Sequence, residues 1–440
     1  MARRNLRVLL LSLLVCLVCA PKVSRSTRIL WYAMHQIESR YLAPIEERQL
    51  FEGAMTGMTM TLDDYSTYIA PAILEDFNEQ IDREFGGVGI EIRIDLRTKY
   101  LTVASPLVDT PAYASGIRAG DRIERIDDES TQGLSIEDAA ERLRGRPGEP
   151  VTLTVLPKGA KQARDVRLVR AVIHIDTVVG DTRAADGSWS YLLKDHPQIA
   201  CLRINSFGDQ TGAQMRRVVS SVINQGMKGL IIDLRDNPGG LLPAAIEVCD
   251  MFLDPDGPPT PGPGGQLIPA GLIVTTRDRN GRVLDEHRAS GDGTIGGFPI
   301  AVLVNQASAS ASEIVAACLQ DHQKAAVFGE RSFGKGTVQE ILNLHPDQGV
   351  LKLTTASYWR PSGRDINRRE GAEQWGVSPD EGCEIRLSDQ ELADLQLARR
   401  IRDVAESYDS EELADESIPA FRDRQREAAI AWIEKRLKEG

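Results

Sequence analysis

The stretch ASASASEIVAACLQDHQKAAVFGERSFGKGTVQ, residues 307–339, says most about the fold and the chemistry of this chain. It predicts a helix that begins in a cluster of serines, then a strand, and then a lysine between two glycines. Ser310 stands three residues before Glu313, the spacing of a capping box, so we expect a helix over Glu313–Gln320. A side chain at this helix start would have free backbone amides and the positive end of the helix dipole beside it.

Ser310 and Lys335 are the candidate nucleophile and base in this stretch. A serine hydroxyl is a poor nucleophile until a neighbouring base takes its proton, and a lysine amine can do so when burial lowers its pKa. Taken alone, a serine at a helix start is usually only a cap, and a lysine between glycines is usually a loop residue. The occurrence of both in one short stretch favours a catalytic pair.

The sequence motifs of this stretch resemble those of the carboxyl-terminal processing proteases, which are tail-specific serine peptidases of the Ser–Lys type. The family's nucleophile is the middle serine of SASAS, here Ser310, and its lysine in FGKG, 25 residues later, is Lys335. The resemblance implies that Gln339, in GKGTVQ, orients the lysine amine by a hydrogen bond. Asp321 matches an aspartate that the family carries near the site, whereas Ala307 stands where the family often has glycine.

A second segment, Asp236–Gly240 with the sequence DNPGG, follows the apolar strand GLIIDLR. Ligands bind at the carboxyl ends of strands in open α/β sheets, and the glycines let backbone amides approach a substrate. The resemblance implies that Gly239 or Gly240, together with the amide of Ala311, forms an oxyanion hole. The sequence does not choose between the two glycines, and a tight turn that only precedes a helix is the simpler alternative.

Two other interpretations of the same stretch are weaker. Gly329, Gly334 and Lys335 fit the spacing of a phosphate-binding loop, but Gly336 follows where that loop needs a hydroxyl, and a strand follows instead of a helix. A Ser–His–Asp triad through His322 is conceivable, since triads are recognised by geometry. However, His322 adjoins Asp321 in sequence, so their side chains would point to different faces of a helix end.

Residues 85–171 are expected to form a PDZ-like domain. Its glycine-rich opening leads into the alternating strand IEIRI, and the segments SPLVDTPAYASGIRAGD and SIEDAAERLRGRPGE follow. In PDZ domains the loop amides bind the terminal carboxylate of a peptide, which adds a strand to the sheet edge. The resemblance therefore implies substrates with apolar or unstructured C-terminal tails, bound by Gly86, Gly87, Val88 and Gly89.

The rest of the chain completes the predicted architecture. Residues 26–82 read as a helical N-terminal region, and residues 172–386 alternate strands with helices, which predicts an α/β protease core with a mostly parallel sheet. Residues 387–440 read as a charged helical extension, either a solvated tail or an assembly arm. The overall expectation is an inserted PDZ-like domain in a serine endopeptidase. The alternative is a noncatalytic PDZ scaffold that only binds C-terminal peptides, which the presence of Ser310 and Lys335 disfavours.

The composition and the N-terminal residues indicate which partners the chain can bind and where it is located. The net charge of −12 over 440 residues offers no basic stripe and argues against nucleic acid. Residues 1–20 place three arginines before an apolar run, which predicts a cleaved signal peptide or, less well, an uncleaved membrane anchor. Either one implies export to the periplasm or cell envelope. The sequence leaves open whether the chain forms a homo-oligomer.

The cysteines and histidines give no support for a metal site. Beyond the predicted signal peptide no two cysteines form a C-x-x-C pair, and the six histidines do not cluster with them. The apolar surroundings of Cys201, Cys249 and Cys318 predict buried thiols. The expected Ser–Lys chemistry requires no metal and no organic cofactor.

Overall fold

The computed structural model describes residues 24–74, 84–95, 98–107, 110–174, 176–184, 188–291, 293–345, 348–403 and 421–439. The predicted signal peptide, residues 1–20, lies outside the described residues. The chain divides into two units. One comprises residues 1–72 and 340–354, and the other comprises residues 73–339 and 355–440.

A five-stranded sheet forms the centre of the larger unit, in the order β10-β13-β14-β19-β20. Parallel pairing joins β13 to β14, β14 to β19 and β19 to β20, whereas β10 runs antiparallel to β13. The strands span Val178–Val179, Ile199–Ile204, Gly229–Asp233, Ile300–Val304 and Ala325–Gly329. Every residue of β14 and β19 is buried, because helices cover both faces of this sheet.

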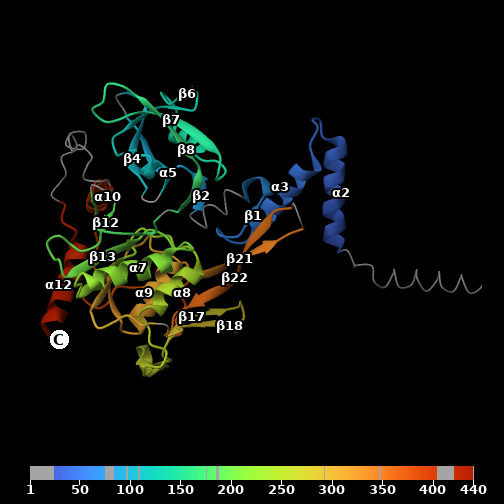
Figure 1. Cartoon of the computed structure of the whole chain (residues 1–440). Helices are drawn as coiled ribbons and strands as arrows, with labels where there is room; N and C mark the ends of the chain where they lie inside the picture. The colour runs from blue at the N-terminus through green and yellow to red at the C-terminus, as the bar shows by residue number, and fades with distance from the viewer. Residues whose placement is uncertain are drawn as a thin grey trace, which may run out of the picture. The chain divides into compact units, whose positions relative to one another are not determined.

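The alternation of side chains along β14 assigns the helices to the two faces. Leu230 and Ile232 pack with helices α7, α8 and α9, while Ile231 packs with helix α12. Figure 1 shows α7, α8 and α9 together beside the sheet. These helices span Thr211–Asn224, Leu242–Asp250, Ala311–Asp321 and, for α12, Arg424–Glu439. Helix α9, at whose start the serine cluster lies, is almost entirely buried and packs against α8 and strand β20.

The prediction of a mostly parallel sheet is not confirmed. Although the central sheet has three parallel pairings, the other sheets within the described residues are antiparallel. In the second large sheet β1 pairs β22, which also pairs β17 and β21, and β17 pairs β18. A tight turn at Asp278–Arg282 joins β17 to β18, and such short turns permit only antiparallel neighbours. These strands span Thr67–Ile69, Leu272–Arg277, Val283–Arg288, Thr337–Asn343 and Val350–Trp359.

The PDZ-like module contains a six-stranded sheet in the order β3-β4-β5-β7-β8, with β6 beside β5. Its strands span Ile90–Ile94, Leu101–Pro106, Arg122–Ile126, Glu129–Ser130, Pro150–Leu156 and Arg164–Val169. Helices α5 (Pro111–Ala114) and α6 (Ile136–Leu143) complete a separate apolar core. The antiparallel pair of β2 (Glu84–Gly87) with β9 (Ala171–His174) joins the two ends of the module.

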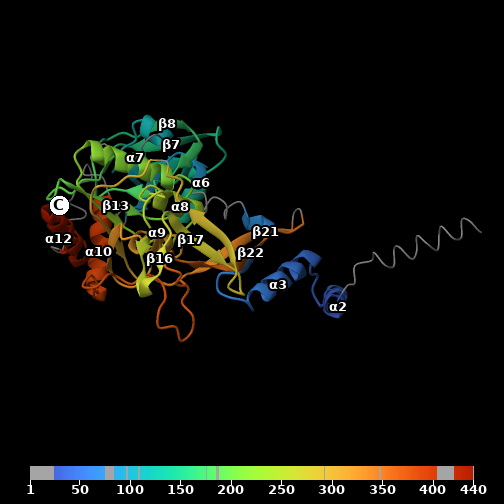
Figure 2. The ribbon, with the colours of Figure 1, turned by 90° about the horizontal axis from the view of Figure 1, so that it is seen from below.

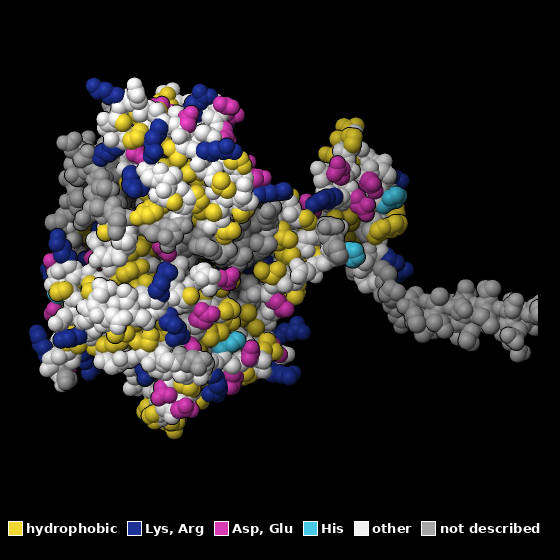
Figure 3. All heavy atoms as spheres, in the orientation of Figure 1, with side chains coloured by type: hydrophobic (Ala, Val, Ile, Leu, Met, Phe, Trp, Pro, Cys, Tyr) yellow, Lys and Arg dark blue, Asp and Glu magenta, His cyan; other side chains and the backbone are white. Residues whose placement is uncertain are grey.

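The helical N-terminal region consists of α2 (Arg25–Arg40) and α3 (Glu47–Thr59). Helix α2 buries none of its residues, and hydrophobic side chains show on its surface in Figure 3. After α3, Asp63 accepts the amides of Tyr65 and Ser66, each at 2.8 Å, so residues 63–66 form a polar turn. Within the described part of the chain, no helix is both long enough and apolar enough to span a membrane.

The C-terminal segment is part of the core. Helix α12 buries Ala429, Ile430 and Ile433 against the central sheet. Helix α10 (Asp389–Asp403) lies next to α12 in Figure 2, and the ion pair of Arg424 with Glu391 joins them. Short elements fill the remaining connections: β11 Thr182–Arg183, β12 Trp189–Ser190, β15 Thr260–Pro261, β16 Leu267–Ile268, and the 3-10 turns Pro71–Ile73 and Pro263–Gly265.

Candidate active site

Ser310 stands at a sharp turn between strand β19 and helix α9. Its backbone has φ +54° and ψ −114°, in a region that residues other than glycine rarely adopt. An ordinary N-cap residue is extended instead. Such backbone strain persists only where the surroundings enforce it, and it gathers at functional sites.

The three serines of the cluster have different environments. The hydroxyl of Ser308 donates to the Leu234 carbonyl at 2.8 Å, and that of Ser312 donates to the Asn237 carbonyl at 3.0 Å. Both serines are fully buried and fasten the start of α9 to the segment that follows β14. Ser310 lies between them and is only half-buried. The two flanking serines are therefore structural, and Ser310 is the accessible one.

The carboxylate of Glu313 joins the turn that carries Ser310 to the loop that carries Lys335. It accepts the Ser310 amide at 2.9 Å, which is the Glu313 half of the predicted capping box, and the Lys335 amide at 2.8 Å. It also accepts the Ser332 hydroxyl at 2.5 Å and the Gly334 amide at 2.6 Å. Burial raises the pKa of Glu313 to about 6, against the lowering effect of these four hydrogen bonds. Sequence reasoning assigned Glu313 only to the cap and missed this wider role.

Close packing explains the glycines on both sides of Lys335. A Cβ on Gly334, whose φ is +88°, would lie 2.6 Å from the ring of Trp375. A Cβ on Gly336 would lie 2.2 Å from the Asn367 backbone nitrogen. The loop thus fits tightly between its neighbours. Lys335, which this loop carries, is half-buried.

Gln339 lies four residues after Lys335, on strand β21. Its side-chain amide donates to the Thr337 hydroxyl at 2.8 Å and to the Thr337 carbonyl at 3.3 Å. The side chain is half-buried, as is that of Lys335. Gln339 therefore belongs to the same local segment as the lysine, and Thr337 fixes its orientation.

Asn237 is the residue that shapes the glycine turn after β14. Its buried side chain donates to the Ile204 carbonyl at 2.7 Å and accepts the Gly239 amide at 2.8 Å. Its own carbonyl accepts the Ala309 amide at 3.0 Å. The turn is thereby fixed directly to the segment that carries Ser310. Sequence reasoning did not single out Asn237, although its place inside DNPGG was a usable signal.

The two glycines of the turn differ in their surroundings. A Cβ on Gly239 would lie 2.8 Å from the Ser310 Cβ, so this glycine touches the turn that carries Ser310. Its amide, however, already donates to Asn237. Gly240 has φ +146° and forms an isolated β-bridge with Phe207. In this bridge the Phe207 amide donates to the Gly239 carbonyl, and the Leu241 amide donates to the Phe207 carbonyl. Among the described residues no acceptor faces the amide of Gly240 or that of Ala311.

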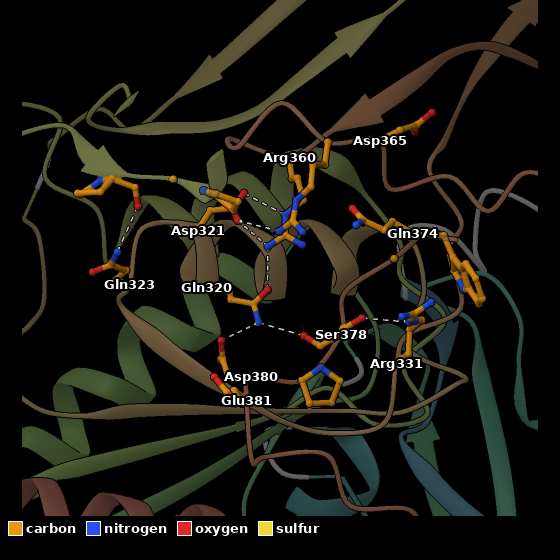
Figure 4. Close-up of a pocket in the computed structure, with 17 residues that line it drawn as sticks. Gln320, Asp321, Gln323, Arg331, Arg360, Asp365, Gln374, Ser378, Asp380 and Glu381 are labelled. Atoms are coloured by element: carbon orange, nitrogen blue, oxygen red, sulfur yellow. Dashed lines mark hydrogen bonds and ion pairs between the residues drawn. The ribbon is translucent and has the colours of Figure 1, made fainter. Parts of the chain in front are cut away.

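His322 and Asp321 lie at the far end of α9, about 18 Å from Ser310 at a rise of about 1.5 Å per residue. The His322 ring nitrogen Nε2 is 2.7 Å from the Leu272 carbonyl, and burial lowers the pKa of this histidine. Figure 4 shows Asp321 paired with Arg360, whose Nη2 and Nε lie 2.6 and 3.0 Å from the carboxylate oxygens. The structure thus separates both residues from Ser310, and a Ser–His–Asp triad through His322 does not form.

The glycine-rich loop of the PDZ-like module, Gly86–Gly89, is also held by close packing. A Cβ on Gly86 would lie 2.1 Å from the Gly145 carbonyl oxygen, and one on Gly89 would collide with Thr110. The loop carbonyls of Val88 and Gly89 are occupied by the amides of Ala112 and Leu107. In the described part of the chain no carbonyl accepts the amides of Val88 and Gly89. Strand β3, which follows, pairs only with β4 there.

The described residues contain no group of three His, Cys, Asp or Glu side chains with a geometry suited to a metal ion. The candidate site therefore consists of a half-buried serine and lysine, the carboxylate that joins their backbones, and a glycine turn.

Comparison with known proteins assigns this chain to a family. The sequence profile of peptidase family S41 matches residues 198–261 and 264–382. The PDZ domain profile matches residues 102–157, and the profile of the activating protease CtpB N-terminal domain matches residues 25–72.

Curated relatives agree with the profiles. The chain is 34% identical over 372 residues to the carboxy-terminal-processing protease of Bartonella bacilliformis, which covers 81% of this chain and 77% of the relative. It is 33% identical over 339 residues to the carboxyl-terminal-processing protease of Picosynechococcus sp., which covers 77% of this chain and 74% of the relative. A solved photosystem II D1 C-terminal processing protease is 28% identical, over 85% of this chain and 91% of that one, with a TM-score of 0.44.

The chain belongs to the carboxyl-terminal-processing proteases of peptidase family S41. It is thus a serine-type peptidase with a PDZ domain, and the alternative of a noncatalytic scaffold is set aside.

Proposed function

We propose that Ser310 is the nucleophile and Lys335 the general base of this peptidase. The observation that carries the proposal is the Glu313 carboxylate, which holds the backbone amides of Ser310 and Lys335 on one oxygen, at 2.9 and 2.8 Å. A single rigid group thus fixes both residues in one place, which is the positioning that catalysis by a paired nucleophile and base requires. Gln339 orients the lysine amine.

The reaction follows from these roles. Neutral Lys335 accepts the Ser310 proton, and the serine oxygen attacks the peptide carbonyl. Backbone amides stabilise the oxyanion, the lysine protonates the leaving amine, and water hydrolyses the acyl-enzyme. We assign the oxyanion hole to the amides of Gly240 and Ala311, because the Gly239 amide is already bonded to Asn237.

The substrates are proteins with apolar or unstructured C-terminal tails. The amides of Val88 and Gly89, which no carbonyl among the described residues accepts, suit a terminal carboxylate. The tail would add a strand at the open edge of β3, beside helix α6, where the half-buried Ile90, Ile92 and Ile94 offer an apolar face. The basic and apolar residues 1–20 support export to the periplasm or cell envelope.

The test is cleavage of an unfolded protein with an apolar C-terminal tail by the purified full chain and its variants. Ser310→Ala and Lys335→Ala should each remove nearly all activity, because nucleophile and base act as a unit. Gln339→Ala should be milder. His322→Ala serves as the matched control, since the His322 ring contacts the Leu272 carbonyl at the far end of α9, away from Ser310. Near-normal cleavage by Lys335→Ala, with loss in His322→Ala, would show that the base is misassigned.

A further inference from the structure

The glycine turn, Asp236–Gly240, is held by an arginine that lies beyond the residues matched by the S41 peptidase profile. The S41 profile ends at residue 382, whereas Arg399 lies on helix α10. Its Nη1 lies 2.6 Å from Asp236 Oδ2, at the first residue of the turn. Its Nη2 lies 2.8 Å from Asp233 Oδ2, at the end of strand β14. One guanidinium therefore spans the junction between the strand and the turn.

Asp236 needs such support. Its φ of +63° is left-handed, a conformation that costs a residue other than glycine free energy. Two side chains hold it there. Asn305 donates to Asp236 Oδ1 at 2.8 Å and accepts its amide at 3.0 Å, and Arg399 binds the other carboxylate oxygen. Glycine would adopt this backbone without strain, but only a carboxylate can accept both partners.

The Arg399 side chain is well placed to act on this turn. It is only 11% exposed and Asp233 is 6% exposed, so this ion pair is shielded from solvent and salt, whereas Asp236 is 37% exposed. Behind it, Arg235 pairs with both Asp233 and Asp423, the latter just before α12. Although burial alone would raise the pKa of Asp233, Arg235 and Arg399 lower it well below its usual value, so this anchor stays charged.

The Gly240 amide, the proposed oxyanion donor, lies four residues after Asp236 in the same turn. Asn237 follows directly, and it fixes both the Gly239 amide and the Ala309 amide. A shift of Asp236 would therefore move the amide of Gly240 relative to Ser310. A displacement of about 1 Å at a catalytic group can cost about 100-fold in rate.

We propose that Arg399 is a positioning residue for the oxyanion hole, through its ion pair with Asp236. The inference rests on the proposed function, because it needs Ser310 as the nucleophile and the Gly240 amide as an oxyanion donor. In this protein the segment beyond the peptidase profile thus completes the catalytic turn.

The test compares Arg399→Ala with Arg402→Ala in the full chain. Arg402 lies one turn further along α10 and pairs with Asp181 at 2.8 Å, away from the glycine turn. Arg399→Ala should lower kcat about 10- to 100-fold with KM changed less than about twofold. Arg399→Lys, which keeps the charge, should recover part of the loss, and Arg402→Ala should stay within about threefold of the unaltered chain in kcat.

Asp236→Asn separates positioning from stability. Asparagine tolerates the left-handed backbone, so this variant should fold with a melting temperature close to that of the unaltered chain and lose kcat as Arg399→Ala does. If Arg399 acts through Asp236, the double variant should lose no more than either single variant. Additive losses, or equal losses in Arg399→Ala and Arg402→Ala, would overturn the inference. Retention of activity by Ser310→Ala would instead refute the proposed function itself.

Discussion

At the scale of single residues, Glu313 explains why a serine and a lysine 25 residues apart meet at one site. Four donors converge on its two oxygens inside a fully buried pocket. Three of those donors come from the loop at residues 332–335, and the fourth is the Ser310 amide. An ionised carboxylate can accept all four, because it offers about four lone-pair positions.

Replacing Glu313 with glutamine should therefore lower kcat about 10- to 100-fold while KM changes little. The amide keeps the shape of the side chain but has one acceptor oxygen, and its NH2 group would face donors. Steady-state cleavage rates of the variant and the unaltered chain measure the effect. Exposed Glu286→Gln, on strand β18, is the control for a Glu-to-Gln change. Unchanged kcat in Glu313→Gln would remove Glu313 from the positioning of the site.

The free energy of unfolding should depend on pH through the titration of the Glu313 carboxyl group. Its pKa is about 6 in the folded chain against 4.5 for an ordinary glutamate. The folded state thus holds the proton more tightly, so the contribution of Glu313 to stability is full below about pH 4.5 and is lost as pH rises through 6. The loss amounts to about 2 kcal/mol.

Urea unfolding at pH 5 and pH 7.5 tests this for the unaltered chain and for Glu313→Gln. At each pH, the free energy of unfolding of the unaltered chain is compared with that of Glu313→Gln. The difference in favour of the unaltered chain should be larger at pH 5 than at pH 7.5. Activity should change in the opposite direction, because protonation removes an acceptor from the site. A stability difference that does not depend on pH would contradict the raised pKa.

At the scale of elements, the glycine turn is tightly constrained by close contacts. We expect Gly240→Ala to lower kcat about 100-fold or more. A Cβ there would lie 2.1 Å from the Phe207 carbonyl oxygen, and φ is +146°, so the turn and the Gly240 amide must move. Gly296→Ala is the matched control, since nothing lies within 4 Å of a Cβ at that position. Normal cleavage by Gly240→Ala would rule out its amide as an oxyanion donor.

The β3 edge and its glycine loop should distinguish a free C-terminal carboxylate from an amide. Charge-assisted hydrogen bonds are the stronger kind, and amidation removes the charge that the loop amides would bind. Ser310→Ala in the full chain, which cannot consume the peptide, should bind an apolar free-acid peptide at least about fivefold more tightly than its amide. Fluorescence titration with both peptides measures this. Equal affinities would mean that the loop only connects β2 to β3.

The elements show how far the sequence could predict this structure. Alternation of strands and helices correctly predicted the central α/β layers and helix α9, because local periodicity carries that information. It did not predict the antiparallel sheet around β17 and β22, since pairing partners far apart in sequence leave no local pattern. Ser310 and Lys335 could be selected from local motifs, whereas the partners of Asp236, on α10 and after β19, could not.

At the scale of the whole molecule, helix α12 joins the C-terminal segment to the central sheet. Ile433 is fully buried, and a Cβ on Gly229 of strand β14 would lie 2.3 Å from its Cγ2. The charged composition of residues 387–440 concealed this packing, because only one stripe of the helix is apolar.

Ile433→Ala should destabilise the chain by about 2–5 kcal/mol, the usual cost of such a cavity in a close-packed core. Thermal unfolding would report it as a lower Tm. Lys435→Ala on the same helix, whose side chain is 75% exposed, should change Tm by little. An unchanged Tm for Ile433→Ala would mean that α12 is not an integral part of the fold.

The buried thiols provide a way to watch the two layers of the core separately. Cys201 and Cys383 pack on the α12 side of the central sheet, whereas Cys249 and Cys318 pack among α7, α8 and α9. Burial raises the pKa of Cys201 to about 12 and also raises that of Cys318, so the reactive thiolate is scarce while the core stays closed. Alkylation of the native chain, followed by peptide mapping, would therefore report which side of the sheet opens first, without any engineered label.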